Sequence, residues 1–390
     1  MKILFIDFAL DKLGGVERVV STLANELVQN YEVEICSIYR HSPRPFYKFD
    51  EKIQFNYLID NSKLLSTKSN TKAGFYIFRV FEKIYEMISF TNKLRKFCET
   101  RFSEFDVVIF GRTTAAIIFM PYMKQYEGKV IVRDAIHLYD TTNKSKRLMK
   151  KYFPDKVDTL IVSSEESIQL YKEFFGMTNI NIRKIYNPLG IIPAERQSEE
   201  NKRIIGVGRY CRQKGFENLL YAYAQISKKY PEWTLALIGA GEDYLHYRRI
   251  CKQLDITDRV EFYKSSNIVE EYSKADIFVM CSRNEGYANA LVEAMACGVP
   301  SITYDWYVGA DDIVEDGING IIVRLEDRKK YFATNGITKN DADSLAKAIN
   351  MLIENADLRN LLSSNARLIC ESRDRLKITD EWIKIIEERK

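Results

Sequence analysis

The chain has 390 residues, of which 46% are hydrophobic and 12% aromatic, enough for two domains with full-sized cores. Its net charge of +4 is too small to indicate binding of bulk nucleic acid. The sequence contains no run of about 18 apolar residues, so we predict no membrane-spanning segment. The seven cysteines are scattered and include no Cys-x-x-Cys pair, which predicts a reduced, cytoplasmic protein. The N-terminus is typical of a strand rather than of a signal peptide.

Strand and helix signals alternate through the first half of the chain. The apolar spacing of residues 15–30 predicts a helix, and short apolar runs predict strands at 3–8, 33–39, 106–110, 129–133 and 159–162. Such a βαβ series indicates a parallel sheet covered by helices. The pattern pauses near residue 185, and the polar stretch 194–202 predicts an interdomain linker.

The first strand and the first helix are joined by the segment Leu13-Gly14-Gly15-Val16-Glu17-Arg18. Adjacent glycines let the backbone approach a ligand closely. The segment is not a Gly-x-Gly-x-x-Gly sequence, so it does not predict NAD binding. By itself it is more typical of an ordinary turn than of a ligand-binding loop.

Residues 61–102 form a basic and aromatic helical stretch, with nine Lys and Arg residues against three Glu. This composition is typical of a segment that lies on an anionic membrane surface or binds a lipid diphosphate. It is equally typical of an amphipathic helix whose aromatic side chains fill the domain core. The sequence leaves both interpretations open.

A second α/β series begins after the linker. We predict strands at 203–207, 234–238, 260–263, 276–281, 301–304 and 320–323, with helices at 216–229 and 244–253 between them. Closing helices are predicted at 344–355, 356–369 and 379–388. The expected domains are therefore residues 1–190 and 201–370, both Rossmann-like, followed by a terminal segment 371–390 around Trp382.

The loop after the first strand of this second series carries two cations. Arg209 and Lys214 lie five positions apart, after Gly208, so both can converge on one anion. Arg offers a bidentate fork and Lys a compact charge, a combination suited to a diphosphate. A solvated basic loop is the alternative.

A pair of glutamates spans the junction between a later strand and helix. The strand at 276–281 is followed by a loop with Glu285, and a helix begins near Asn289 with Glu293 one turn inside it. Ligands of open α/β sheets bind at the carboxyl ends of strands, and the unpaired N–H groups that open a helix favour a phosphate. Carboxylates pair well with hydroxyls, so a sugar nucleotide suits this site.

Together these motifs resemble the family-four glycosyltransferases of the GT-B fold. The resemblance rests on Glu285-x7-Glu293 within the string Glu-Gly-Tyr-x-Asn…Glu-Ala-Met-Ala-Cys-Gly-Val-Pro, on Gly-Gly-x-Glu-Arg, and on Gly-Arg…Lys-Gly. It covers most of the chain and is strongest from 203 to 323. It implies an α/β protein with two Rossmann-like domains facing a central cleft. The first would bind the acceptor and the second the nucleotide sugar, with the last helix crossing back to the first domain.

The resemblance also implies an activity. A retaining glycosyltransferase of this type moves a hexose from a nucleotide sugar, here expected to be UDP-linked, to a glycan acceptor, without a cofactor or a metal. The aromatic version of the segment 304–311 resembles the branch that builds bacterial polysaccharides and lipid-linked oligosaccharides. We therefore expect an acceptor on polyprenyl diphosphate and a cytoplasmic enzyme, peripheral at the inner face of the cell membrane. Aromatic side chains of 304–311 would stack on a sugar, or else pack as an ordinary loop.

The resemblance assigns roles residue by residue. Glu285 would orient the sugar hydroxyls and support the positive anomeric centre, Arg209 and Lys214 would hold the diphosphate, and Glu293 would bind the ribose. His137 matches a cleft histidine in one register, whereas Ala135 takes that position in the other. The remaining donor contacts are expected from Gly14, Gly15, Gly208, Gly241, Tyr263, Lys264, Gly286, Tyr287, Asn289, Ala290 and Leu291.

Two other functions stay open at this stage. A GT-B sugar-nucleotide epimerase would turn over UDP-sugar without an added acceptor, but it needs acid and base residues on both cleft walls. A non-catalytic sugar-nucleotide-binding protein would release no nucleotide with any acceptor.

Overall fold

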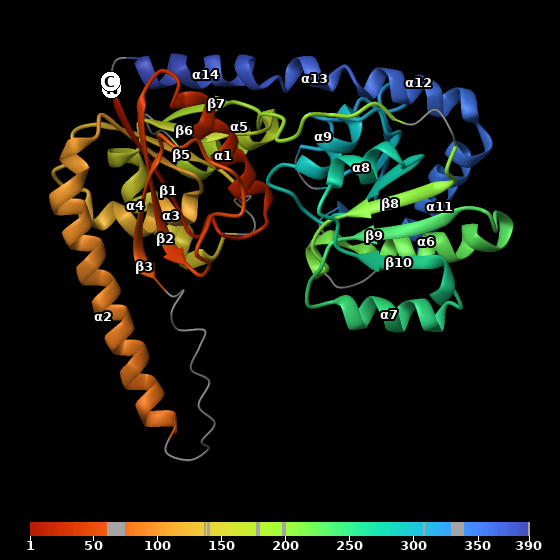
Figure 1. The fold of residues 1–390 in the computed structure, drawn as a ribbon, viewed down its shortest axis with the longest axis horizontal. Coiled ribbons are helices and arrows are strands. Elements are labelled where there is room, and N and C mark those ends of the chain that lie inside the picture. Colours follow the sequence, from red (N-terminus) through yellow and green to blue (C-terminus); the bar gives the residue numbers. More distant parts are fainter. Residues whose placement is uncertain are drawn as a thin grey trace. The chain divides into compact units, whose positions relative to one another are not determined.

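The computed structural model of the chain contains two compact units, drawn as a ribbon in Figure 1. The first comprises Met1–Ser163, Ile168–Pro188 and Arg375–Lys390, and the second comprises Ser164–Ser167 and Leu189–Asp374. The described residues exclude 61–74, 136–137, 139–140, 177–179, 197–199, 307–308, 329–338 and 389–390. In the helix at 75–101, side chains are described only from Ile88 onward.

The first unit is built on a parallel sheet of seven strands in the order β3-β2-β1-β4-β5-β6-β7. The strands are β1 (Lys2–Asp7), β2 (Glu32–Arg40), β3 (Gln54–Asp60), β4 (Val107–Phe110), β5 (Lys129–Arg133), β6 (Thr159–Val162) and β7 (Asn181–Lys184). The five strands predicted from apolar runs are present, whereas β3 and β7 were missed. Both are edge strands with mostly partial exposure, and the sequence of β7, Asn-Ile-Arg-Lys, is too polar to form an apolar run.

Side chains from the first sheet enter two separate cores. In β1, Ile3 and Phe5 belong to one cluster and Leu4 and Ile6 to the other, as the alternation of a strand requires. The helices of this part of the chain are α1 (Gly15–Leu27), α2 (Phe75–Arg101), α3 (Thr113–Phe119), α4 (Asn143–Lys156), α5 (Glu165–Phe175) and α14 (Arg375–Glu387). The terminal helix α14 contacts α1, and its Trp382 is 1% exposed in the cluster that contains Ile3 and Phe5. The last helix of the chain therefore belongs to the first unit.

The described half of α2 is amphipathic. Leu94 and Cys98 are buried in the core of the first unit, and Phe90 and Phe97 pack against it. The exposed face carries Lys93, Arg95 and Lys96. Here the aromatic side chains contribute to the core, while the basic ones remain at the surface. Among the described residues, no helix is both long enough and apolar enough to cross a membrane.

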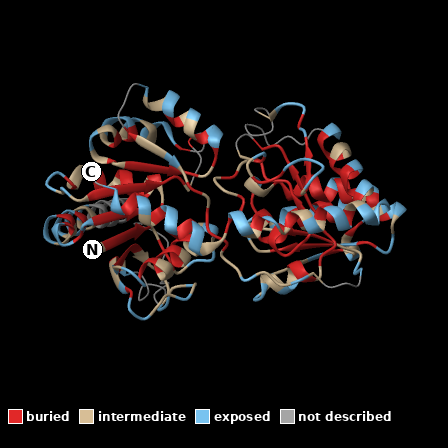
Figure 2. Cartoon of the chain, turned by 90° about the horizontal axis from the view of Figure 1, so that it is seen from above, coloured by how far each residue is buried: buried red, intermediate tan, exposed pale blue. Residues whose placement is uncertain are grey.

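The second unit is built on a parallel sheet of six strands in the order β10-β9-β8-β11-β12-β13. The strands are β8 (Arg203–Val207), β9 (Thr234–Ile238), β10 (Val260–Tyr263), β11 (Ile277–Met280), β12 (Ser301–Tyr304) and β13 (Ile321–Val323), as predicted to within one residue at each end. Its helices are α6 (Phe216–Lys229), α7 (Tyr244–Gln253), α8 (Ile268–Ser273), α9 (Asn289–Ala296), α11 (Lys339–Glu354), α12 (Ala356–Ala366) and α13 (Ile369–Ser372). Figure 2 shows that the strands of both sheets are largely buried, whereas the helices expose an outer face.

Candidate active site

Two loops of the second unit leave its sheet at the same edge. One loop follows β8 and contains the short 3₁₀ turn Arg212–Lys214, and the other follows β11 and leads into α9 at Asn289. The parallel strands β8 and β11 are neighbours, with Ile205 opposite Phe278. From this pair the strand order runs outward in opposite directions, which is the topological switch point where open α/β sheets bind ligands.

The two loops bring a cation and a carboxylate together. Lys214 Nζ donates to Glu285 Oε1 at 2.7 Å, and the side chains are 16% and 8% exposed. Gly208 makes room for this lysine, because a Cβ there would lie 3.0 Å from Lys214 Cε. Arg209, on the same loop, is exposed, and its Nη2 lies 3.5 Å from Gln213 Oε1. This edge of the sheet therefore carries the Lys214–Glu285 ion pair and, on the same loop as Lys214, the exposed guanidinium of Arg209.

Sequence reasoning missed the residues that hold these loops together. Arg283 is 2% exposed, and its Nη2 lies 2.5 Å from Oε1 of Glu217, in the first turn of α6. Gln213 Nε2 donates to the carbonyl of Asn284 at 3.0 Å. The sequence carries no local signal of this contact, because Arg283 needs a counter-ion only once it is buried, and that burial follows from tertiary packing.

Glu293 lies one turn inside α9 and is buried. It accepts a hydrogen bond from Tyr272 Oη at 3.3 Å and is 5% exposed. The expectation that α9 opens with unpaired N–H groups is wrong for two residues, because the Asn289 N–H donates to Tyr287 O and the Leu291 N–H to Ala288 O, each at 3.0 Å. The tight turn before the helix uses these donors, which helix periodicity does not reveal. Gly286 and Ala290 are partly exposed beside them.

Of three further predicted donor contacts, Lys264 and Gly241 follow the carboxyl ends of β10 and β9, whereas the Tyr263 hydroxyl contacts Arg203 at the amino end of β8. Tyr263 Oη donates to Glu271 Oε2 at 2.7 Å, and burial together with this carboxylate raises the pKa of Tyr263 to about 12. Lys264 follows it and is exposed. Gly241 packs against the loop after β8, since a Cβ there would lie 2.2 Å from Tyr210 O.

Tyr287 is tied to the end of the second unit. Arg373 is 4% exposed, and its Nε donates to Tyr287 Oη at 2.6 Å. The backbone carbonyl of Arg373 accepts a hydrogen bond from the Leu189 N–H at 2.9 Å. Arg373 was not selected from the sequence, since an arginine near the chain end carries no local signal of this contact.

The Gly-Gly loop of the first unit lies at the start of α1. Gly14 caps the helix with its carbonyl, which accepts from the Arg18 N–H at 3.1 Å, and Gly15 is the first helical residue. Glu17 Oε1 lies 2.9 Å from Arg112 Nη2, and Arg112 Nε lies 2.5 Å from Asp7 Oδ1. The loop is thus attached to the ends of β1 and β4. His137, the fourth predicted catalytic residue, lies outside the described residues.

The aromatic segment after β12 contributes to the core. Trp306 is 2% exposed within a hydrophobic cluster, and Tyr304 Oη donates to Asp341 O at 3.0 Å. Of the two interpretations of 304–311, packing therefore holds for these side chains, whereas Tyr307 falls outside the described residues.

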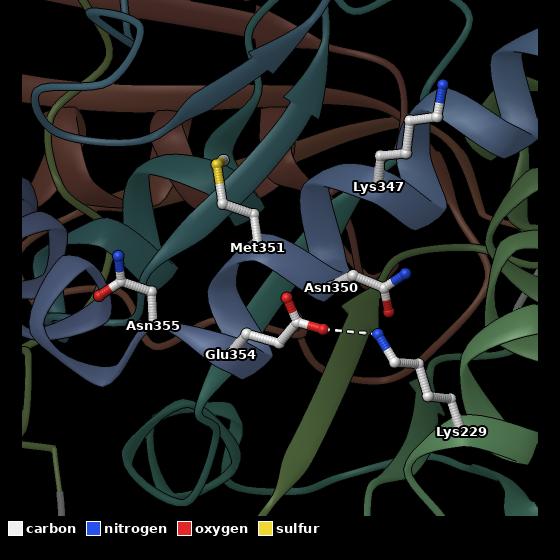
Figure 3. Close-up of a pocket in the computed structure, with 6 residues that line it drawn as sticks. All are labelled: Lys229, Lys347, Asn350, Met351, Glu354 and Asn355. Atoms are coloured by element: carbon white, nitrogen blue, oxygen red, sulfur yellow. Dashed lines mark hydrogen bonds and ion pairs between the residues drawn. The ribbon is translucent and has the colours of Figure 1, made fainter.

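Away from this edge, a surface pocket of about 560 Å³ lies between the ends of α6 and α11. Figure 3 shows Lys229 and Glu354 pointing toward each other across it, with Nζ and Oε1 2.6 Å apart. Both side chains are more than half exposed, and none of the predicted site residues lines the pocket. Within the described part of the chain, no three His, Cys, Asp or Glu side chains are grouped as a metal site would require.

Comparison with known proteins identifies the family. A family model described as "Glycosyltransferase Family 4" matches residues 13–190, and one described as "Glycosyl transferases group 1" matches residues 191–369. An uncharacterized glycosyltransferase of Haemophilus influenzae is 30% identical over 386 residues, which cover 98% of each chain. The chain belongs to the glycosyltransferase family. This confirms the resemblance seen in the sequence.

Other relatives of this glycosyltransferase have more specific names. In Campylobacter jejuni, the GalNAc-alpha-(1->4)-GalNAc-alpha-(1->3)-diNAcBac-PP-undecaprenol alpha-1,4-N-acetyl-D-galactosaminyltransferase is 25% identical over 398 residues, covering 100% of this chain and 99% of that protein. An amylovoran biosynthesis glycosyltransferase of Erwinia amylovora is 22% identical, over 85% of this chain and 88% of its own. The relatives thus include proteins named for polysaccharide and lipid-linked oligosaccharide synthesis.

Solved structures confirm the GT-B fold of this glycosyltransferase. Anabaena HepE in complex with UDP and glucose superposes with a TM-score of 0.76 at 19% identity, covering 100% of both chains. The pneumococcal O-GlcNAc transferase GtfA in complex with UDP and GlcNAc gives a TM-score of 0.78 at 16% identity, covering 99% of this chain and 98% of its own. The predicted fold class is therefore confirmed.

Proposed function

We propose that this glycosyltransferase is a retaining enzyme that moves a hexose from a UDP-sugar to a glycan carried on a polyprenyl diphosphate. The observation that carries the proposal is the Lys214–Glu285 pair, 2.7 Å apart, on the loops after two adjacent parallel strands. Such an edge combines positive charge for a diphosphate with a carboxylate for sugar hydroxyls. The exposed Arg209 adds a second cation on the same loop.

The proposed chemistry follows the charges. As the bond between the anomeric carbon and the diphosphate breaks, its electron pair passes to the phosphate oxygen. Lys214 and Arg209 stabilise that developing negative charge. The acceptor hydroxyl attacks from the face that the diphosphate leaves, and its proton passes to the leaving phosphate oxygen. Glu285 supports the positive anomeric centre and orients the sugar hydroxyls, so no covalent bond to the protein forms.

The donor and the acceptor are assigned by analogy with relatives. Anabaena HepE and pneumococcal GtfA were each crystallised with UDP and a sugar, which supports a UDP-linked donor here. The Campylobacter relative is named for an undecaprenyl-diphosphate-linked substrate, which supports a lipid-linked acceptor. Exposed Lys93, Arg95 and Lys96 on α2 offer charge for an anionic membrane surface, and we place the enzyme at the cytoplasmic face of the cell membrane.

We expect Glu293 to bind the ribose and the turn Asn289–Leu291 to approach the phosphates. Tyr263 and Lys264 would lie beside the nucleobase, and Gly14 and Gly15 of the first unit would contribute backbone to the diphosphate. His137 would contact the transferred sugar. Substitution of each by alanine, or of each glycine by valine, and measurement of UDP affinity by calorimetry would separate donor contacts from acceptor contacts.

The deciding experiment is a donor screen followed by linkage analysis. Purified enzyme is incubated with a panel of UDP-sugars and with a short-chain polyprenyl-diphosphate glycan or the same glycan free. We expect one UDP-sugar to be consumed only with acceptor, and NMR of the product to show the anomeric configuration of the donor. Glu285→Gln is the matched inactive control. An inverted product would contradict retention, an epimer formed without acceptor would indicate an epimerase, and UDP-sugar binding without turnover would indicate a binding protein.

A further inference from the structure

Arg283 lies buried between the two loops of the proposed active site. Its guanidinium meets Glu217 Oε1 at 2.5 Å through Nη2, and Nε donates to Arg212 O at 3.1 Å. Its backbone N–H donates to Gln213 O at 2.8 Å. Arg283 is 2% exposed and Glu217 is 8% exposed. One residue of the loop after β11 thus contacts the loop after β8 and the helix α6 that follows it.

The contacts between the two loops advance in register. Arg283 Nε meets Arg212 O, Gln213 Nε2 meets Asn284 O at 3.0 Å, and Lys214 Nζ meets Glu285 Oε1 at 2.7 Å. The Lys214–Glu285 pair is therefore the last of three successive contacts between the loops. Its geometry depends on the two contacts before it.

A buried arginine is a costly way to join two loops unless its shape is required. Burial of a charge is unfavourable without a partner, and an apolar pair of similar volume often serves stability as well. An arginine offers a rigid planar fork, which here donates to a carboxylate and to a backbone carbonyl at once. Glu217 lies in the first turn of α6, where the helix dipole favours a carboxylate. The arrangement fixes orientation rather than merely filling space.

We propose that Arg283, with Glu217 as its counter-ion, is a positioning residue for catalysis that sets the relative placement of Lys214 and Glu285. The inference rests on the proposed function of that pair. Arg283 acts through the loops, because its guanidinium is buried against Glu217 and Arg212. Displacement of a catalytic group by about 1 Å costs on the order of 100-fold in rate, so a loosened contact should lower kcat strongly.

The test compares Arg283→Lys with a matched buried arginine. Arg359 on α12 is 6% exposed, pairs with Glu200 and donates to Ile353 O at 2.8 Å, outside the two loops. Arg283→Lys keeps the charge and loses the fork, and Arg359→Lys makes the same change elsewhere in the second unit. We expect Arg283→Lys to lower kcat about 10- to 100-fold, with the acceptor KM unchanged within about 2-fold. Arg359→Lys should keep wild-type kcat despite a similar drop in Tm.

Nucleotide binding gives a second readout. UDP and uridine affinities are measured by calorimetry for wild type and both variants. Because Lys214 is proposed to bind the diphosphate, Arg283→Lys should lower the affinity for UDP about 10-fold and leave the affinity for uridine unchanged. General destabilisation would not produce this selectivity. If Arg283→Lys does not fold, Gln213→Ala removes the neighbouring contact to Asn284 O and should lower kcat about 10-fold.

The outcomes separate the two proposals. A wild type that neither binds UDP nor transfers sugar overturns the proposed function, and the positioning role with it. If the wild-type enzyme instead binds UDP and transfers sugar while Arg283→Lys and Gln213→Ala keep its kcat and its ratio of UDP to uridine affinity, the positioning role alone is overturned.

Discussion

Both sheets carry a cluster of charged side chains where neighbouring strands end, and the two clusters are balanced differently. In the first unit, Arg112 lies between Asp7 at 2.5 Å and Glu17 at 2.9 Å. Burial opposes the charge of Arg112, but the two carboxylates outweigh it and raise its pKa. In the second unit, Lys214 faces the single carboxylate of Glu285, and Arg209 is exposed.

This difference indicates that the first cluster stabilises the fold and that the second is available to bind a ligand. In the first cluster Asp7 is 1% exposed and the nearby Arg133 6%. The side chains of Arg112 and Glu17 are 14% and 13% exposed, and the charges of the cluster neutralise one another. Burial lowers the pKa of Arg133 to about 10, so it remains charged at neutral pH. The second cluster keeps positive charge near solvent. We therefore expect charge removal in the first unit to reduce stability and charge removal in the second to reduce turnover.

The largest effect is expected from Lys214→Ala. Loss of a charge partner of the transition state should lower turnover by about two to three orders of magnitude, while the fold survives because the ammonium is partly exposed. Initial rates with the preferred UDP-sugar and a thermal melt measure both quantities. Lys229→Ala, which breaks the exposed pair with Glu354, is the control and should leave turnover unchanged. Normal turnover by folded Lys214→Ala would remove this cluster from catalysis.

The next effect concerns the outer surface of the first unit. We expect the enzyme to float with anionic liposomes at low salt and to be released at high salt, since screening weakens the attraction. Changing Lys93, Arg95 and Lys96 to Glu should abolish flotation, because three lost cations alone are worth about 3 kcal/mol, or about 100-fold in partitioning.

A matched triple variant controls for net charge. Lys228, Lys252 and Lys347 are exposed on the second unit, and their change to Glu should leave flotation intact. Wild-type enzyme that ignores anionic liposomes and glycosylates free and lipid-linked glycans equally would contradict the membrane proposal and leave α2 as a core helix only.

The ion-pair cluster around the buried carboxylate of Asp7 should matter for folding. Arg112→Ala leaves Asp7 and Glu17 without their shared cation, and we expect the free energy of unfolding to fall by about 3 kcal/mol in a denaturant titration. Arg183→Ala breaks an exposed pair with Glu388 in the same unit and should cost less than about 1 kcal/mol. Equal losses from the two variants would show that the Arg112 cluster is no scaffold.

The smallest effect is expected from chelation. Lys214 and Arg209 already supply two cations for the diphosphate, so activity should persist in EDTA within about 2-fold. Rates are compared before and after dialysis against EDTA, and again with added Mg²⁺. A complete loss that Mg²⁺ restores would show that the two side chains are insufficient.

The local sequence pattern predicted the bounds of strands that are apolar and of helices that are amphipathic. β11 was expected to within one residue at each end, α9 was expected to begin near Asn289, and the loop between them was expected to carry Glu285. The polar edge strand β7 was missed, since an edge strand need not be apolar. The N–H groups of Asn289 and Leu291 were misjudged because the hydrogen bonds of a tight turn depend on its exact backbone.

The sequence by itself determined the α/β series, the loops that carry Lys214 and Glu285, and the family, because each leaves a signal within a few residues. Only the tertiary structure decided that these two side chains, 71 positions apart, lie 2.7 Å from each other. The same holds for the burial of Arg283 against Glu217 and of Trp306 in the core. The physical reason is that strand adjacency in a parallel sheet is fixed by long-range packing, which brings the loops after β8 and β11 together, and no local pattern encodes that pairing.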